Sequence, residues 1–483
     1  MFSRRSARSA ASSPGRAPAR DRSAFARMTV RAALPVAAAG GLAVVSLVAP
    51  AAATVAAPAH SATAAAVRPV PDIGGPILKT GQFPAPQTIA QCQADFGINC
   101  YTPVMYRVAY DLNPLYAKGI TGAGKTIVIV DSFGSPTIAS DLHTFDAQFG
   151  FPDPQLQIEQ FGAIPPFDPT NSTMVSWAEE TTLDVEYAHA IAPGAKIVLA
   201  ETSVAETEGV TGFPEMMNAE QSLINQGVGD VITQSFGATE QTFPGVSSGN
   251  DSSLTDLRYA YQDALAHHVT VLASSGDTGA TNYESDSETL YPYPVTGWPA
   301  TDPLVTAVGG TQLNLDQNGN KITPDVVWND GFGASGGGDS AVFTRPLYQI
   351  GVAKTVGSKR GVPDIAMSAA VNGGCWVYFS FLPGQVGWDI FGGTSEASPI
   401  FSGIVALANQ VAGHRLGLIN PALYLLGALH HAGVPGTGIV DVTSGNNSFG
   451  GVTGYNAVAG YDMATGWGTI DAAKFVPALA RLG

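Results

Sequence analysis

Short apolar runs alternate with longer helical segments along most of this 483-residue chain, and the alternation constrains its fold more than any other feature. Runs with the length and composition of buried strands are expected at 126–131, 196–200, 230–234, 269–274 and 304–308. Helices are expected at 177–191, 214–226, 253–267 and 394–411. Because strands joined through helical crossovers run parallel, we predict an α/β fold with a parallel sheet flanked by helices on both faces.

A serine stands in a tight turn at the start of the helix expected at 394–411. Ser395 lies in the segment Gly392-Gly393-Thr394-Ser395-Glu396-Ala397-Ser398-Pro399, in which small residues open the helix. A serine in such a turn is exposed and lies near the positive end of the helix dipole, which suits a nucleophile. In ordinary loops the same residues only cap a helix, so the turn alone leaves both interpretations open.

A nucleophilic serine needs a base, and two acidic residues are better candidates than any histidine. None of the eight histidines is followed by Gly-Thr or Gly-Ser, the context expected of a catalytic histidine. Glu180 and Asp184 are four residues apart in an expected helix, so both carboxyls lie on one face, one turn apart. Two acids this close share a proton, and their pKa values separate. Such a pair can deprotonate a serine in acid, where a histidine would already be protonated.

A third acid follows one of the expected strands. Asp277 lies just after the run 269–274, and active sites of parallel sheets form where strands end. A protonated Asp277 can donate a hydrogen bond to the oxyanion that forms during acyl transfer. The alternative is a turn residue that binds its own backbone. Asp131 ends the first strand in the same way, and it either extends the proton network or is a plain turn residue.

Together, these motifs resemble those of the sedolisin family of serine-carboxyl peptidases. The resemblance implies a subtilisin-like fold and activity at acidic pH. It assigns Ser395 as the nucleophile, Glu180 as the general base, Asp184 as the carboxyl that supports the base, and Asp277 as the oxyanion-hole acid. Other segments resemble family landmarks in family order, so that the resemblance covers residue 100 to the C-terminus: 191–197, 235–237, 307–311, 335–338 and 360–364.

The resemblance also implies one bound Ca²⁺ near the C-terminus. In the family, two aspartates and several backbone carbonyls surround the ion, an oxygen-rich set that suits calcium. The corresponding ligands here are the carboxylates of Asp441 and Asp462 and the carbonyls of Val442, Val458 and Gly460. Family members usually have glycine at the position of Val458, so this residue departs from the pattern. Apart from the resemblance, the two aspartates are interpreted as caps of turns.

The N-terminal region predicts export. Residues 1–63 are expected to be an export signal, because an apolar run follows an arginine-rich lead and ends in small residues. The run is long enough to span a membrane, but proline and glycine interrupt it, which favours cleavage over anchoring. Residues 64–100 are expected to form a spacer or short pro-segment, since they leave no room for the family's long pro-domain. Residues 101–483 form the expected peptidase domain.

Composition limits the partners. The formal net charge of −16 at pH 7 disfavours nucleic acid as a partner. We expect a secreted, extracellular monomer that acts on protein or peptide substrates and has no stable membrane association after signal removal. Substrate backbone is expected to pair as an added strand beside the glycine-containing segments 235–237 and 335–337.

Three cysteines indicate no zinc or redox site. Cys92 and Cys100 are eight positions apart and can close a small loop in an oxidising compartment, whereas Cys375 is then unpaired and expected to be buried.

The sequence therefore predicts a secreted, acid-acting serine-carboxyl endopeptidase that hydrolyses peptide bonds through an acyl-enzyme on Ser395. Two alternatives are a catalytically inactive secreted binding module and a hydrolase of non-peptide acyl groups, both on the same fold.

Overall fold

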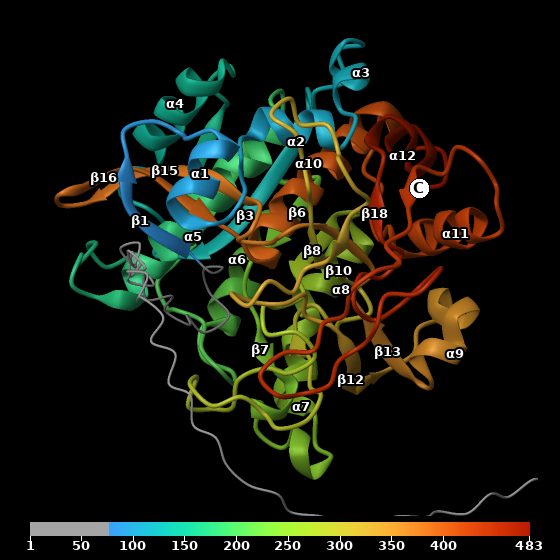
Figure 1. Ribbon diagram of the computed structural model, residues 1–483. Coiled ribbons are helices and arrows are strands. Elements are labelled where there is room, and N and C mark those ends of the chain that lie inside the picture. The colour runs from blue at the N-terminus through green and yellow to red at the C-terminus, as the bar shows by residue number, and fades with distance from the viewer. Residues whose placement is uncertain (1–76) are drawn as a thin grey trace, which may run out of the picture. The chain divides into compact units, whose positions relative to one another are not determined.

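A mainly parallel sheet forms the centre of the computed structural model, which describes residues 77–483 (Figure 1). Its strands lie in the order β11-β10-β8-β6-β3-β5-β4, with β14 also paired to β10. All neighbouring strands are parallel except β10 and β11. Their bounds are Thr126–Ser132 (β3), Leu156–Phe161 (β4), Lys196–Thr202 (β5), Val231–Gln234 (β6), Thr270–Ser274 (β8), Thr306–Gln312 (β10), Val326–Val327 (β11) and Ile365–Ser368 (β14).

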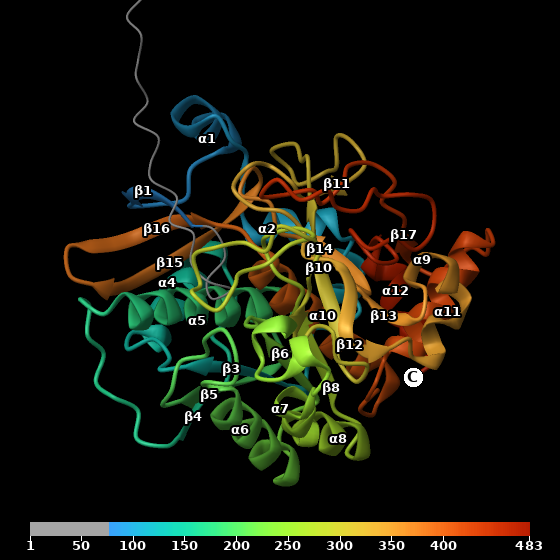
Figure 2. The same ribbon diagram turned by 90° about the horizontal axis from the view of Figure 1, so that it is seen from below.

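Helices cover both faces of this sheet, as predicted. On β3, Ile127 and Ile129 pack in one apolar cluster with Val185 of α5 (Ser172–Ile191), while Val128 and Val130 pack in another with residues of α6 (Phe213–Asn225) and α8 (Tyr259–Ala266). Figure 2 shows α5 and α6 on opposite sides of the strands. Successive side chains of a strand point to opposite faces of the sheet. A strand that is apolar throughout therefore needs other elements packed on both faces.

One helix runs close to the middle of the sheet and carries the predicted nucleophile. α10 (Thr394–Ala412) contacts β3, β6, β8, β10 and β14 on the face that α5 also covers, and it packs along α5. Its residues from Thr394 to Asn409 are all buried, as expected for a helix enclosed by other elements.

Several elements differ from those expected. The strand expected at 304–308 begins at Thr306 and continues to Gln312. The helix expected at 253–267 is broken into α7 (Ser252–Thr255), a short 3₁₀ turn and α8. A long antiparallel hairpin, β15 (Gly374–Leu382) and β16 (Gln385–Phe391), was not expected at all.

The remaining elements surround the sheet. They are α2 (Pro103–Ala109), α3 (Asn113–Tyr116), α4 (Ile138–Phe149), β7 (Ala238–Thr239), β9 (Gly297–Trp298), β12 (Gly338–Thr344), β13 (Lys359–Val362), α9 (Ala353–Val356), α11 (Asn420–His431), β17 (Ile439–Val440), β18 (Thr469–Ile470) and α12 (Ala472–Leu479). Within residues 77–483, no helix has the length and apolar character needed to cross a membrane.

The described part of the predicted spacer is folded. β1 (Ile77–Phe83) pairs antiparallel with β16, α1 (Ile89–Phe96) follows, and β2 (Cys100–Tyr101) pairs with β15. Cys92 and Cys100 form a disulfide with Cα atoms 6.1 Å apart, and Cys375 is free and buried, as expected. The predicted export signal, residues 1–63, lies outside the described residues.

Candidate active site

The turn before Ser395 depends on two glycines. Gly393 has a φ of 102°, in the region that residues with a Cβ rarely adopt. A Cβ on Gly392 would lie 2.8 Å from the carbonyl oxygen of Ala369. The chain can therefore pass from β16 into α10 within two residues, which places Ser395, 4% exposed, in the first helical turn.

Asp277 and Ser395 line the same pocket. Its walls also include Phe236, Gly237, Asn282 and Trp298. The Oδ1 atom of Asp277 accepts hydrogen bonds from the backbone N–H and the hydroxyl of Thr394, both at 2.7 Å. Burial raises the pKa of Asp277 to about 6, although these two bonds favour the ionised form. Asp277 is therefore a carboxyl that keeps its proton in acid. It contacts Thr394, the residue that precedes the predicted nucleophile.

The amides of Gly336 and Gly337 hold the Asp277 loop. The N–H of Gly336 donates to the carbonyl of Gly276 at 2.7 Å, and the N–H of Gly337 donates to that of Gly279 at 3.2 Å. A Cβ on Gly336 would lie 2.1 Å from the carbonyl oxygen of Ser275. These N–H groups are used within the protein, so pairing of substrate with 335–337 stays a prediction that would have to use other atoms of the segment.

Glu180 and Asp184 both lie on the helix α5, one turn apart as the four-residue spacing predicted, and both are buried. Burial raises the pKa of Asp184 well above its usual range, and the nearby carboxyls of Glu180 and Asp131 raise it further. Asp131, at the end of β3, is also buried, and its burial raises its pKa to about 7. Three neighbouring acids cannot all ionise in a buried site. The cluster therefore retains protons at pH values well above the pKa range usual for carboxyls.

Ser235 connects the acid pair to the nucleophile's helix. It follows the end of β6 and is fully buried. Its hydroxyl donates to Asp184 Oδ1 at 2.8 Å and also lies 3.4 Å from the backbone carbonyl of Ser395. From the sequence, this residue is expected in a substrate-binding segment. The strand-end rule that identified Asp277 applies equally to Ser235 and would have placed it beside the acids.

The structure thus brings the predicted residues together from different parts of the chain. Ser395 and Asp277 share one pocket, and Glu180 and Asp184 belong to α5, which packs along α10.

Comparison with known proteins shows which proteins this chain resembles. Residues 171–421 match the model of the subtilase family. The chain is 32% identical over 393 residues to kumamolisin of Bacillus sp. (strain MN-32), covering 78% of this chain and 63% of the relative. It is 30% identical to the solved structure of Pseudomonas sedolisin, a serine-carboxyl proteinase, with a TM-score of 0.65 and coverage of 78% of this chain and 97% of that one.

The chain belongs to the sedolisin family. It is also 31% identical to sedolisin of Pseudomonas sp. (strain 101), covering 83% of this chain and 64% of the relative. Tripeptidyl-peptidase 1 of Mus musculus is 33% identical, with coverage of 60% of this chain and 50% of the relative. The chain spans less than two thirds of the length of these curated relatives.

The two aspartates predicted to bind calcium both accept hydrogen bonds from the segment 458–460. Asp441 Oδ2 accepts from the N–H of Gly460 at 2.8 Å, and Asp462 Oδ2 accepts from the N–H of Val458 at 3.0 Å. Asp441 Oδ1 is buried and has no hydrogen-bond donor. Burial raises the pKa of Asp462 to about 6 and also raises that of Asp441. A buried carboxylate oxygen without a donor fits a cation, and the second aspartate binds the same segment.

Val458 does not distort this segment. Among described residues other than glycine, only Asp111, Phe133, His268 and Ser287 have a positive φ, so Val458 keeps a backbone conformation open to a β-branched residue. Its side chain is 50% exposed. The departure from the family's glycine at this position therefore leaves the segment's backbone free of strain.

Proposed function

We propose that this chain is an acid-acting serine-carboxyl endopeptidase that hydrolyses peptide bonds through an acyl-enzyme on Ser395. One observation carries the proposal: Ser395 and Asp277 line a single pocket, while the acid pair on α5 is joined to the same helical turn through Ser235. A related protein of the same family is named as a serine-carboxyl proteinase.

The geometry suggests a role for each group. Asp184 retains a proton because it is buried beside other acids, so Glu180 is the carboxylate that removes the proton of Ser395 as its Oγ attacks the peptide carbonyl. Asp277 Oδ1 already accepts two hydrogen bonds from Thr394, so the proton of Asp277 resides on Oδ2 and can be donated to the oxyanion. Glu180 then returns its proton to the leaving amine, and water hydrolyses the acyl-enzyme.

Activity is expected to peak in acid and to fall as pH rises through about 6. Asp277 donates a hydrogen bond only while protonated, and its folded-state pKa of about 6 sets the pH above which this form is lost. The measurement is kcat/KM on a denatured protein from about pH 3 to about pH 8. An optimum at neutral or alkaline pH would contradict the assigned role of Asp277.

The same preparation distinguishes the two alternatives. A serine-directed covalent probe should label Ser395, identified by peptide mass mapping, and labelling should follow the pH profile of hydrolysis. A folded protein that neither reacts with the probe nor cleaves protein would support the inactive binding module. Cleavage of simple esters without cleavage of peptides would support a non-peptide acyl hydrolase.

We also propose one Ca²⁺ ion held by Asp441 and Asp462 with the carbonyls of Val442, Val458 and Gly460. The support is the buried Oδ1 of Asp441 and the convergence of both aspartates on one segment. When bound, the ion would neutralise these carboxylates and hold the segment 441–462 together.

Chelation is expected to lower the melting temperature. A ligand present at about 100 times its Kd stabilises the folded state by about 2.7 kcal/mol, and a chelator removes that contribution. Thermal unfolding is compared in excess Ca²⁺ and in EGTA, for the wild type and for Asp441→Asn. The variant should resemble the chelated wild type and show no response to Ca²⁺. Identical melting of the wild type with and without Ca²⁺ would contradict the site.

Export of the chain is a further part of the proposal, resting on the sequence of residues 1–63. Expression in a secreting host is expected to yield an extracellular, monomeric protein that lacks this segment. N-terminal sequencing and light scattering test both statements, and a product retained in the cell with an intact N-terminus would contradict export.

A further inference from the structure

The carbonyl of Ser395 lacks its ordinary helical partner. In an α-helix this carbonyl accepts from the N–H four residues later, but residue 399 is a proline inside α10 and has no N–H. The hydroxyl of Ser235 lies 3.4 Å from this carbonyl. The hydroxyl of Ser235 therefore lies where it can replace the missing N–H donor. Without it, this buried backbone oxygen of the nucleophile would be unpaired.

Ser235 has a single hydroxyl hydrogen and two acceptors within reach. When Asp184 is ionised, its Oδ1, at 2.8 Å, takes the hydrogen, because a charged acceptor at the shorter distance is the stronger one. When Oδ1 is protonated, Asp184 becomes the donor, and the hydrogen of Ser235 turns to the Ser395 carbonyl. The orientation of this one hydroxyl thus depends on where the protons of the acid cluster lie.

We propose that Ser235 is a positioning residue that couples the protonation of the Glu180–Asp184 pair to the backbone of Ser395. This inference rests on the proposed function and deepens it. The groups that face Asp184 are Glu180 on its own helix, Asp131 from β3 and Ser235 after β6. In acid, with Asp184 protonated, the hydroxyl holds the nucleophile's turn in place. Once the carboxyl ionises, that support is withdrawn.

Replacing Ser235 tests the coupling. Ser235→Ala is expected to lower kcat roughly 10- to 100-fold with KM within about twofold, because the lost contacts orient the reacting groups and do not bind substrate. The pKa of Asp184, followed by NMR titration of its carboxyl carbon, should rise, since the ionised carboxylate loses a hydrogen-bond donor. A residue with a purely structural role would lower the melting temperature and leave this pKa unchanged.

Two further variants make the test specific. Pro399→Ala supplies the missing N–H, so Ser235→Ala should reduce kcat less in a Pro399→Ala background than in the wild type. Ser398→Ala is the matched control, because the Ser398 hydroxyl bonds to that of Thr233 at 2.8 Å, also between α10 and β6, and touches neither acid. Its kcat and pH profile should equal those of the wild type.

The outcomes separate this role from the proposed function. An active wild type together with an unchanged kcat and an unchanged Asp184 pKa in Ser235→Ala would overturn the coupling alone. So would an equal loss of kcat in the presence and absence of Pro399→Ala. A wild-type protein that hydrolyses no peptide at any pH would overturn the proposed function, and the role of Ser235 with it.

Discussion

Ser395→Ala is expected to lower kcat/KM on a denatured protein by on the order of 10⁴- to 10⁶-fold while the protein stays folded. The acyl-enzyme cannot form without the Oγ atom, and what is left of catalysis comes from the oxyanion donors and substrate binding alone. The substitution removes one oxygen at the edge of a pocket, where the side chain is 4% exposed, so the packing of α10 is retained.

Ser402→Ala provides the matched control for this variant. Ser402 lies on the same helix, is fully buried, and donates only to the carbonyl of Pro399 at 2.7 Å. Its activity should stay within about twofold of the wild type. Both variants are assayed at the acid optimum, with circular dichroism to verify folding. Retained hydrolysis in a folded Ser395→Ala protein would show that another residue is the nucleophile.

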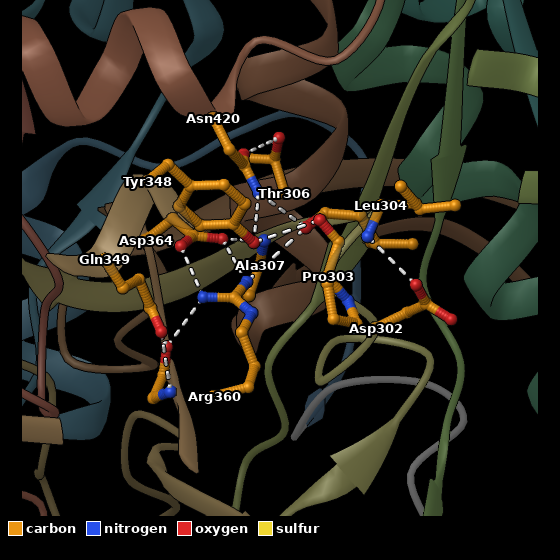
Figure 3. Close-up of polar contacts among 12 residues, drawn as sticks. Asp302, Pro303, Leu304, Thr306, Ala307, Tyr348, Gln349, Arg360, Asp364 and Asn420 are labelled. Atoms are coloured by element: carbon orange, nitrogen blue, oxygen red, sulfur yellow. Dashed lines mark hydrogen bonds and ion pairs between the residues drawn. The ribbon is translucent and has the colours of Figure 1, made fainter. Parts of the chain in front are cut away.

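Arg360→Ala is expected to reduce the free energy of unfolding by about 3–5 kcal/mol. Arg360 and Asp364 form a fully buried ion pair, with Nη1 2.7 Å from Oδ1 and Nη2 2.5 Å from Oδ2. Figure 3 shows the guanidinium against this carboxylate, which also accepts from the N–H of Ala307 at 2.8 Å. Removing the arginine would leave Asp364 as a buried, uncompensated charge.

The location of the Arg360–Asp364 pair explains why its loss should destabilise the whole fold. Asp364 lies between β13 and β14, and its backbone carbonyl accepts from the N–H of Trp467, close to the predicted calcium segment. Arg415→Ala is the control, because Arg415 is 26% exposed and lies 3.4 Å from Asp230. That variant should lose no more than about 1 kcal/mol in guanidinium unfolding. A similar loss in both variants would contradict the special contribution of the buried pair.

The sequence was sufficient where local pattern and burial coincide. β3, β5 and β6 are apolar runs that the sheet buries on both faces, so they were found within about two residues of their ends. β4 was missed because it is an edge strand with exposed positions and has no continuous apolar run. The hairpin of β15 and β16 was missed although residues 374–382 are an apolar, aromatic run of strand composition, and only its pairing with β1 and β2 needed the tertiary structure.

The candidate site divides in the same way. Residue type and spacing determined that Glu180 and Asp184 share a helical face, and that Ser395 and Asp277 follow turns where a sheet of this kind builds its site. Only the tertiary structure decided that the glycines at 336 and 337 hold the Asp277 loop, and that Ser235 joins Asp184 to the carbonyl left unpaired by Pro399. The physical reason is that the spacing of residues in one helix or strand determines which side chains share a face. The hydrogen bonds of Ser235, to residues 51 and 160 positions away in the sequence, form only once the sheet and its helices have packed.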